Sequence, residues 1–484
     1  MIAQKKLPAQ RVLLWLALIA TVLGILEPSA MLLSIAAAGV GIAVVVRDIA
    51  GLRRGALTPM TFFSLAFAIT GVANAVAVHS LIERGNQSPF DLYTAPDYVY
   101  FACELMLVGG TAILVGFYTA QRWRPWRTVG KLLPKIKARV NDRDLIVGGA
   151  AIAVLSILIT NALGANRFGA VSGLIARLPD LTIFTLSRLG AVRRSRRVMM
   201  VALGLMLVVA VQAALFAYLR AEILLPILAL LTGLVVGSRS LAILRRRALI
   251  PVYLLIALFG VNFATLGRIR SEAGGGEARV AAFRAASTAN ASDSTSDASA
   301  IVVRLSTINQ LSQVGLLAVQ GGFLHGATLE YLAFAFVPRF LWAAKPKIAK
   351  GAWFANRIGQ AILRPDGTYN NSINMTVPGE LYLNFGWGGV VVGSYLFGAL
   401  LALFWSTAMF WADDSNPLGT AFGFYLLLIG IGLVADLQII VTLVAMYLLF
   451  LAGSLVISGV RRSKPLAPMQ LATADVPAAA RLRT

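Results

Sequence analysis

Residues 374–410 read NMTVPGELYLNFGWGGVVVGSYLFGALLALFWSTAMF. This stretch joins two kinds of sequence. Its first part mixes Thr, Glu, Tyr, Asn and Trp with Pro and Gly, whereas residues 388–410 form an apolar run long enough to cross a bilayer as a helix. Polar residues at the end of such a run lie at a membrane surface. We therefore expect a polar site at this junction, carried by a helical membrane protein.

The composition of the whole chain also indicates a membrane protein. Of 484 residues, 58% are hydrophobic and 13% charged, with a mean hydropathy of +0.78. Soluble domains carry about 25% charged residues. A net charge of +22 would suit nucleic acid, but the basic residues stand in short connectors between apolar runs, which is the pattern of membrane orientation. We therefore expect membrane lipids, and no nucleic acid, as partners.

The apolar runs predict an all-α polytopic fold with about twelve transmembrane helices. The expected spans are 12–26, 31–46, 58–82, 98–119, 145–164, 170–191, 198–218, 222–237, 249–266, 388–410, 420–435 and 439–459. The first is expected to be retained, because no small-residue cleavage site follows it. The span 170–191 contains Arg177, Pro179 and Asp180, which predicts a tilted or a broken helix.

Basic connectors set the expected orientation. If every span crosses once, both termini and all the Arg/Lys-rich connectors fall on one side, which the positive-inside rule makes the cytoplasm. These connectors are 47–54, 122–143, 193–197, 239–247 and 461–464. The chain then divides into nine helices (1–266), a long outer loop (267–387), three helices (388–460) and a cytoplasmic tail (461–484). Loops as long as 267–387 are usually functional.

Within the outer loop, three segments are expected. Residues 285–300 read AASTANASDSTSDASA and predict a flexible tether. Residues 303–320 predict an amphipathic helix, and 323–342 a helix lying on or dipping into the outer leaflet.

The polar stretch also carries a family resemblance. Pro338, Arg339, Trp342 and the Lys345-Pro346 pair, followed by Thr376, GELYLNFG at 379–386 and Gly389, resemble the Wzy-type O-antigen polymerases, which join oligosaccharide repeat units. The resemblance covers about fifty residues and the layout of many helices with one long outer loop.

The resemblance implies a membrane glycosyltransferase of the bacterial inner membrane. Its substrate would be an oligosaccharide repeat unit linked to undecaprenyl pyrophosphate, polymerised at the outer face into O-antigen, capsular or exopolysaccharide. It implies a GT-C-like core, and a flippase and a chain-length regulator as protein partners. No nucleotide motif is present, which fits a donor activated by its own pyrophosphate without a cofactor. One cysteine (Cys103) and two histidines (His79, His325) predict no metal site.

Basic residues near the outer face are candidates for binding the lipid pyrophosphate, because guanidinium groups form paired, charge-assisted hydrogen bonds with phosphate. The candidates are Arg220, Arg268, Arg270, Arg339 and Lys345. In the related O-antigen ligases, an arginine at an outer helix start comparable to that of Arg220 engages the pyrophosphate. The alternative for each arginine is interfacial snorkelling or contact with lipid headgroups.

Glu380 is the carboxylate with the best expected position. If 377–386 is helical, Thr376, Glu380 and Asn384 share one face, with Thr376 as a cap. Glu380 would accept the proton of an acceptor hydroxyl, or else it pairs with Lys345 or Arg339 and holds the loop.

Three further groups are candidates with alternatives. His325 is a second base or phosphate ligand, or a structural histidine. Tyr382 stacks on a sugar ring or belongs to an interfacial aromatic belt. Glu104 and Asp436 lie near the outer ends of their spans and are further candidates.

Other functions remain open from the sequence. An O-antigen ligase performs the same chemistry on another acceptor. A polysaccharide flippase or other transporter needs ionisable residues or broken helices at mid-membrane and often internal repeats, whereas here most charges stand at helix ends. A non-catalytic assembly subunit would not need Arg, Lys and Glu concentrated in one outer loop.

Overall fold

The computed structural model describes most of the helical part of the chain. The described residues are 29–52, 57–84, 94–122, 141–163, 170–213, 220–261, 302–303, 305–334, 342, 350–363, 369, 371–411, 417–431, 437 and 439–462. Over these residues the chain forms α-helices and short 3₁₀ turns, and its one β pairing is an isolated bridge between Leu363 and Tyr369. The predicted all-α class therefore holds for the described chain.

The helices follow one another with short connections. The α-helices are α2 (Ala30–Ala50), α3 (Pro59–Arg84), α4 (Val99–Arg122), α6 (Asp142–Leu163), α7 (Ala170–Val192), α8 (Arg196–Gln212), α9 (Arg220–Ser238), α10 (Ile250–Val261), α14 (Ile308–Gly321), α15 (Tyr331–Phe334), α16 (Lys350–Arg357), α17 (Val377–Trp411), α18 (Pro417–Ile431) and α19 (Ile439–Arg462). The 3₁₀ turns are η4 (Pro96–Tyr98), η6 (Leu241–Arg245), η7 (Arg247–Leu249) and η8 (Ala327–Leu329).

Each predicted span from 31–46 onward coincides with a helix, while 12–26 lies outside the described residues. Four stretches are long and apolar enough to cross a membrane: Ala30–Ala50, Pro59–Arg84, Pro96–Arg122 and Val377–Ala408. Several helices expose large apolar side chains on their outer sides; on α3, for example, Leu65 and Val72 are about half exposed. Apolar helices with apolar outward faces suit a lipid environment better than water.

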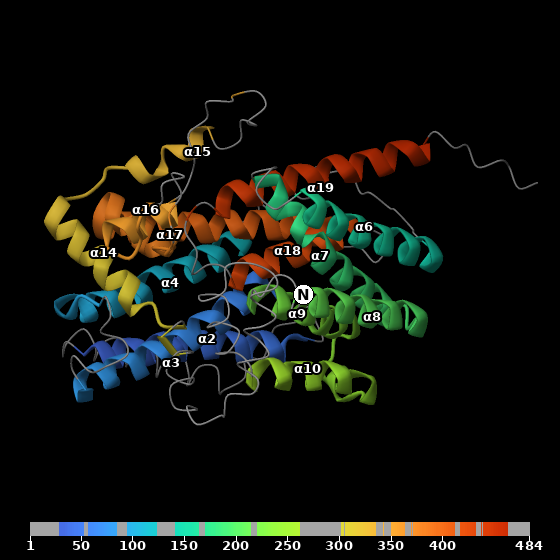
Figure 1. Ribbon diagram of the computed structural model, residues 1–484, viewed down its shortest axis with the longest axis horizontal. Coiled ribbons are helices and arrows are strands. Elements are labelled where there is room, and N and C mark those ends of the chain that lie inside the picture. Colours follow the sequence, from blue (N-terminus) through green and yellow to red (C-terminus); the bar gives the residue numbers. More distant parts are fainter. Residues whose placement is uncertain are drawn as a thin grey trace, which may run out of the picture.

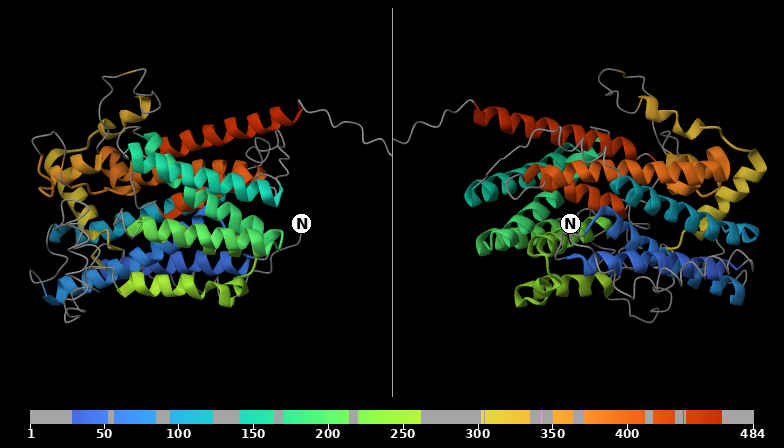
Figure 2. Two further views of the ribbon diagram at one scale, coloured as in Figure 1. Left: turned by 45° about the vertical axis from the view of Figure 1, so that its right-hand side comes forward. Right: turned by 180° about the vertical axis from the view of Figure 1, so that it is seen from behind.

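The helices pack side by side along one common direction (Figures 1 and 2). The main pairs are α17 with α4, α2 with α3, and α7 with α9. The α4–α17 contact is close because Gly116 and Gly398 lack side chains: a Cβ on Gly398 would collide with the backbone carbonyl of Ile113, and one on Gly116 with that of Tyr395. Small residues at a helix crossing bring backbones together, as membrane bundles require.

Helices α14, α15 and α16 gather at one end of the bundle, where α4 and α17 begin (Figure 1). Helix α14 packs against both α4 and α17. We call this end the α14 end. Because α4 and α17 both start there, α17 runs from the α14 end to the opposite end of the bundle.

A buried polar contact fixes α14 to α3. The Asn74 Oδ1 accepts hydrogen bonds from the Ser306 hydroxyl at 2.9 Å and from the Thr307 backbone N–H at 2.9 Å. Asn74 is 1% exposed, and both of its partners are also buried. Next to this contact, the Thr94 hydroxyl donates to Asn309. These bonds satisfy polar groups at the start of α14 that would otherwise be buried without partners.

Two expectations for the backbone are corrected. The predicted surface helix over 323–342 is absent from its described part: residues 322–326 leave helical geometry, with positive φ at Gly322, His325 and Gly326, and only η8 and the four-residue α15 follow. The predicted break in 170–191 is also absent, because α7 runs through Pro179 as one helix. The amphipathic helix predicted over 303–320 is found as α14, beginning at Ile308.

Candidate functional site at the start of α17

Thr376 begins the site by capping α17. Its hydroxyl accepts a hydrogen bond from the Gly379 N–H at 3.2 Å, and its carbonyl accepts from the Glu380 N–H at 3.0 Å. The predicted cap is therefore confirmed. Thr376 has a φ of 66°, which is costly for a β-branched residue. Such a conformation persists only where its surroundings hold it.

The predicted shared face of Thr376, Glu380 and Asn384 points into the protein. Thr376 is 5% exposed, and Glu380 and Asn384 are 0% exposed. A buried carboxylate needs compensating charge and hydrogen bonds. This face of α17 is therefore an internal polar contact and not an open surface.

Glu380 receives three donors from three other parts of the chain. The Lys350 ammonium, at the start of α16, forms an ion pair with its Oε1. The Thr328 hydroxyl donates to the same oxygen at 3.0 Å, and the Leu437 backbone N–H donates to Oε2 at 2.9 Å. Lys350 also lies over the ring of Tyr331, 3.8 Å from its centroid, a cation–π contact. Glu380 thus joins η8, α16 and the start of α19 to α17.

Asn384 holds the turn that replaces the expected surface helix. Its Oδ1 accepts from the Gly326 N–H at 3.0 Å, and its Nδ2 donates to the Thr328 hydroxyl at 2.7 Å. The backbone takes part as well: the Leu324 N–H donates to the Leu383 carbonyl at 2.9 Å, and the His325 N–H donates to the Asn384 carbonyl at 3.1 Å. Residues 324–328 are therefore bonded to α17 through both backbone and side chains.

These carbonyls bond outside the helix because α17 kinks next to them. Gly386 has φ 64° and ψ −158°, which is not helical. In an unbroken helix the carbonyls of Leu383 and Asn384 would accept from N–H groups four residues later. The kink also separates 377–385 from the long apolar part of α17, as the sequence predicted.

The structure places the other predicted residues very differently from one another. His325 is exposed at the tip of the 324–328 turn. Tyr382 is half-buried and belongs to an aromatic cluster, with ring centroids 4.6 Å from Phe101 and 5.5 Å from Trp387. Arg268, Arg270, Arg339, Lys345 and Asp436 lie outside the described residues, and so does the side chain of Arg220, the first residue of α9. Glu104 is half-buried on α4.

Lys350 is the residue that the sequence did not reveal. It stands in a basic stretch with Lys345 and Lys347, and nothing in that stretch distinguishes the lysine that becomes buried. The amphipathic character of 350–357 was the available signal, because a short helix with one apolar face must cover something. Within the part of the chain that the structure describes, no three His, Cys, Asp or Glu side chains gather as metal ligands would.

Comparison with curated proteins finds no match, and comparison with solved structures finds none. One family model, described as "Domain of unknown function (DUF8712)", matches residues 133–431. The match runs from before α6 to the end of α18 and includes Thr328, Lys350 and Glu380. Because it covers more than half of the sequence, the chain belongs to the DUF8712 family.

Proposed function

We propose that this chain is a membrane glycosyltransferase of the bacterial inner membrane. It polymerises oligosaccharide repeat units carried on undecaprenyl pyrophosphate, at the outer face, where the α14 end would lie. The proposal includes twelve spans with both termini in the cytoplasm. It is supported by the polymerase-like sequence at 338–389, by the four helices of membrane-spanning length, and by the polar site at the end of one of them.

The observation that carries the proposal is how α17 holds the 324–328 turn. The motif residues Glu380 and Asn384 do not face solvent; they bind this turn and fix His325 at its exposed tip. Of the two proton acceptors suggested by the sequence, His325 is exposed and Glu380 is fully buried with three donors. An acceptor sugar can therefore contact His325 without displacing any of them.

The proposed reaction is a single displacement at a sugar carbon. The acceptor hydroxyl oxygen attacks the anomeric carbon of the donor, and the His325 imidazole takes the hydroxyl proton. The bond from the anomeric carbon to the pyrophosphate oxygen breaks, and undecaprenyl pyrophosphate leaves with the electron pair. Arg220, Arg268, Arg270, Arg339 and Lys345 are proposed to bind the phosphates, and Tyr382 to stack on the glycan.

Glu380 is then a positioning residue. Its carboxylate holds Thr328, three residues after His325, and is neutralised by Lys350. Replacement of Glu380 by Gln keeps the shape but weakens the contact with Lys350, so the turn that carries His325 loses part of its support.

The test uses purified protein in liposomes with purified lipid-linked repeat units, and measures product chains per enzyme molecule. Loss of a general base typically lowers the rate about 10²–10⁴-fold, so His325→Gln should nearly abolish polymerisation at normal abundance. His79→Gln is the matched control, because His79 is also exposed and pairs only with its helix neighbour Glu83 at 3.1 Å. Normal turnover by His325→Gln would end the assignment of the base.

The product distinguishes the polymerase from its nearest alternative. A polymerase yields a ladder of lengthened lipid-linked chains from repeat units alone. A ligase yields product only when a different lipid acceptor is added. No transfer to either acceptor by active, folded wild-type protein would reject the glycosyltransferase proposal as a whole.

A further inference from the structure

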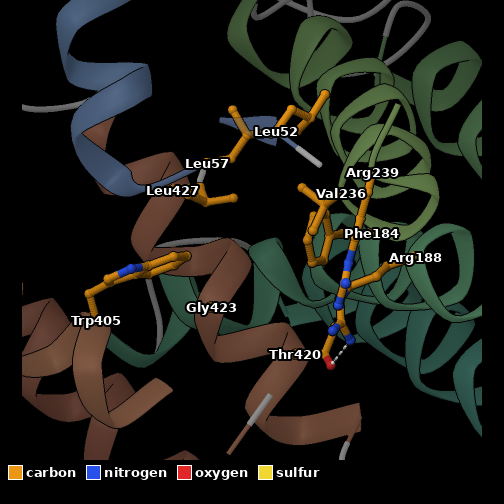
Figure 3. A pocket seen from close by; sticks show the side chains of 10 residues that line it. All are labelled: Leu52, Leu57, Phe184, Arg188, Val236, Arg239, Trp405, Thr420, Gly423 and Leu427. Atoms are coloured by element: carbon orange, nitrogen blue, oxygen red, sulfur yellow. Dashed lines mark hydrogen bonds between the residues drawn. The ribbon is translucent and has the colours of Figure 1, made fainter. Parts of the chain in front are cut away.

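A second polar cavity, of about 190 Å³, lies at the end of the bundle opposite the α14 end (Figure 3). Its walls come from the α2–α3 connection and from α7, α9, α17 and α18. The lining residues are Leu52, Leu57, Phe184, Arg188, Val236, Arg239, Trp405, Thr420, Gly423 and Leu427. No predicted site residue of the glycan site is among them.

Helix α17 connects the two sites. Glu380 stands near its start and Trp405 lies 25 residues later (405 − 380), close to its end at Trp411. At 1.5 Å per residue this is at most about 37 Å along the helix, which compares with about 30 Å for the hydrocarbon core of a bilayer. The cavity therefore lies near the membrane surface opposite the glycan site, beside the basic connectors 193–197 and 239–247.

One side of the cavity is cationic. Arg188, from α7, and Arg239, from the turn after α9, both reach into it (Figure 3). The Arg188 Nη1 donates to the Thr420 hydroxyl at 2.8 Å, which fixes that guanidinium at the wall. None of the described lining residues is acidic. Two guanidinium groups and a hydroxyl around one cavity are the usual recognition set for phosphate oxygens.

The other side is apolar. Leu52, Leu57, Leu427 and the buried Trp405 face the arginines across the cavity in Figure 3. A freely diffusing phosphate compound has no use for such a wall, whereas the glycerol and first acyl carbons of a lipid gain from covering it. Basic pockets between membrane helices on the positively charged side are recognised headgroup sites.

We propose that this cavity binds the phosphate headgroup of an anionic membrane lipid. Arg188 and Arg239 contact the phosphate oxygens, and the acyl chains leave along the apolar wall. The lipid links the ends of α7, α9 and α18, and so stabilises the bundle at the face opposite the glycan site. This proposal does not depend on the glycosyltransferase activity.

The test measures lipid binding to full-length protein by native mass spectrometry in detergent, together with its thermal unfolding temperature. Three probes separate the chemistry: phosphatidic acid has phosphate and tails, diacylglycerol has only the tails, and inorganic phosphate has no tail. The variants are Arg239→Gln and Arg188→Lys. Arg196→Gln is the matched control, because Arg196 is an exposed arginine at the same end and does not line the cavity.

We expect one phosphatidic acid to bind wild type and Arg196→Gln and to raise their unfolding temperature. Arg239→Gln should bind it about 10-fold more weakly, since a charge-assisted hydrogen bond is worth at least one decade of affinity. Arg188→Lys should also weaken binding, because it loses the fork geometry while keeping the charge. Equal binding by the wild type and both variants, or equal binding of diacylglycerol, would overturn the proposal. Equal protection by inorganic phosphate would overturn the lipid as its source.

Discussion

Lys350 and Glu380, thirty residues apart, form an ion pair whose side chains are 8% and 0% exposed. It is the contact that ties the segment before α17 to α17 itself. Burying two charges costs solvation energy, and their attraction offsets that cost only when both partners and their hydrogen bonds are present. The pair is therefore more sensitive to loss of one partner than to loss of both.

Lys350→Met should be strongly destabilising, because it leaves the Glu380 carboxylate buried without its cation. Breaking such a pair costs about 3–5 kcal/mol. The double variant Lys350→Met/Glu380→Gln should recover much of this loss, since no charge remains buried. The measurement is thermal unfolding in detergent, followed by size-exclusion chromatography. A single variant as stable as wild type would show that the ion pair contributes nothing.

Gly398→Ala should weaken the α4–α17 contact. The added methyl group would meet the backbone carbonyl of Ile113, so the helices must separate, at about 1–3 kcal/mol. Gly388→Ala is the control in the same helix: a Cβ there meets no atom within 4 Å. Because alanine favours a helix over glycine, the control should be neutral or more stable. Similar unfolding temperatures for the two variants would contradict the close packing.

Asn74→Leu should loosen the start of α14. It removes the acceptor of the Ser306 hydroxyl and the Thr307 N–H, and a buried polar group without a partner costs about 1–3 kcal/mol. Hydrogen–deuterium exchange should increase over 306–312, with little change in α9. Unchanged exchange at the start of α14 would mean that these bonds do not hold it.

Cysteine labelling tests the orientation. With Cys103 replaced by Ala, Asn371→Cys should react with an impermeant thiol reagent in intact cells, because Asn371 is exposed and precedes α17 at the α14 end. Leu241→Cys, 44% exposed in the arginine-rich turn after α9, should react only after permeabilisation. The reverse pattern would place the α14 end in the cytoplasm and remove the basis for the proposed function.

The sequence predicted the helices well and their partners poorly. Apolar runs located the described helices from α2 to α19 because length and hydrophobicity are local properties. The 324–328 turn was mistaken for a surface helix because residues 323–342 are apolar, and their composition does not show that Leu324 and His325 bond to α17.

The candidate site was predicted in the same uneven way. The four-residue spacing of Thr376, Glu380 and Asn384 gave the common face correctly, since it depends only on helical geometry. The partner of Glu380 could not be predicted, because pairing Lys350 with it depends on how the chain folds back from α16.

The kink at Gly386 divides α17 into two independently set rotations. Residues 377–385 take their orientation from the 324–328 turn and from Lys350, whereas the long apolar part takes its orientation from α4. Each residue of an α-helix turns the chain by about 100°, so a one-residue insertion within a continuous helix would swing Glu380 away from its donors. A break at Gly386 absorbs such a change. The membrane-crossing part can therefore gain or lose a residue next to the break while the polar face keeps its alignment.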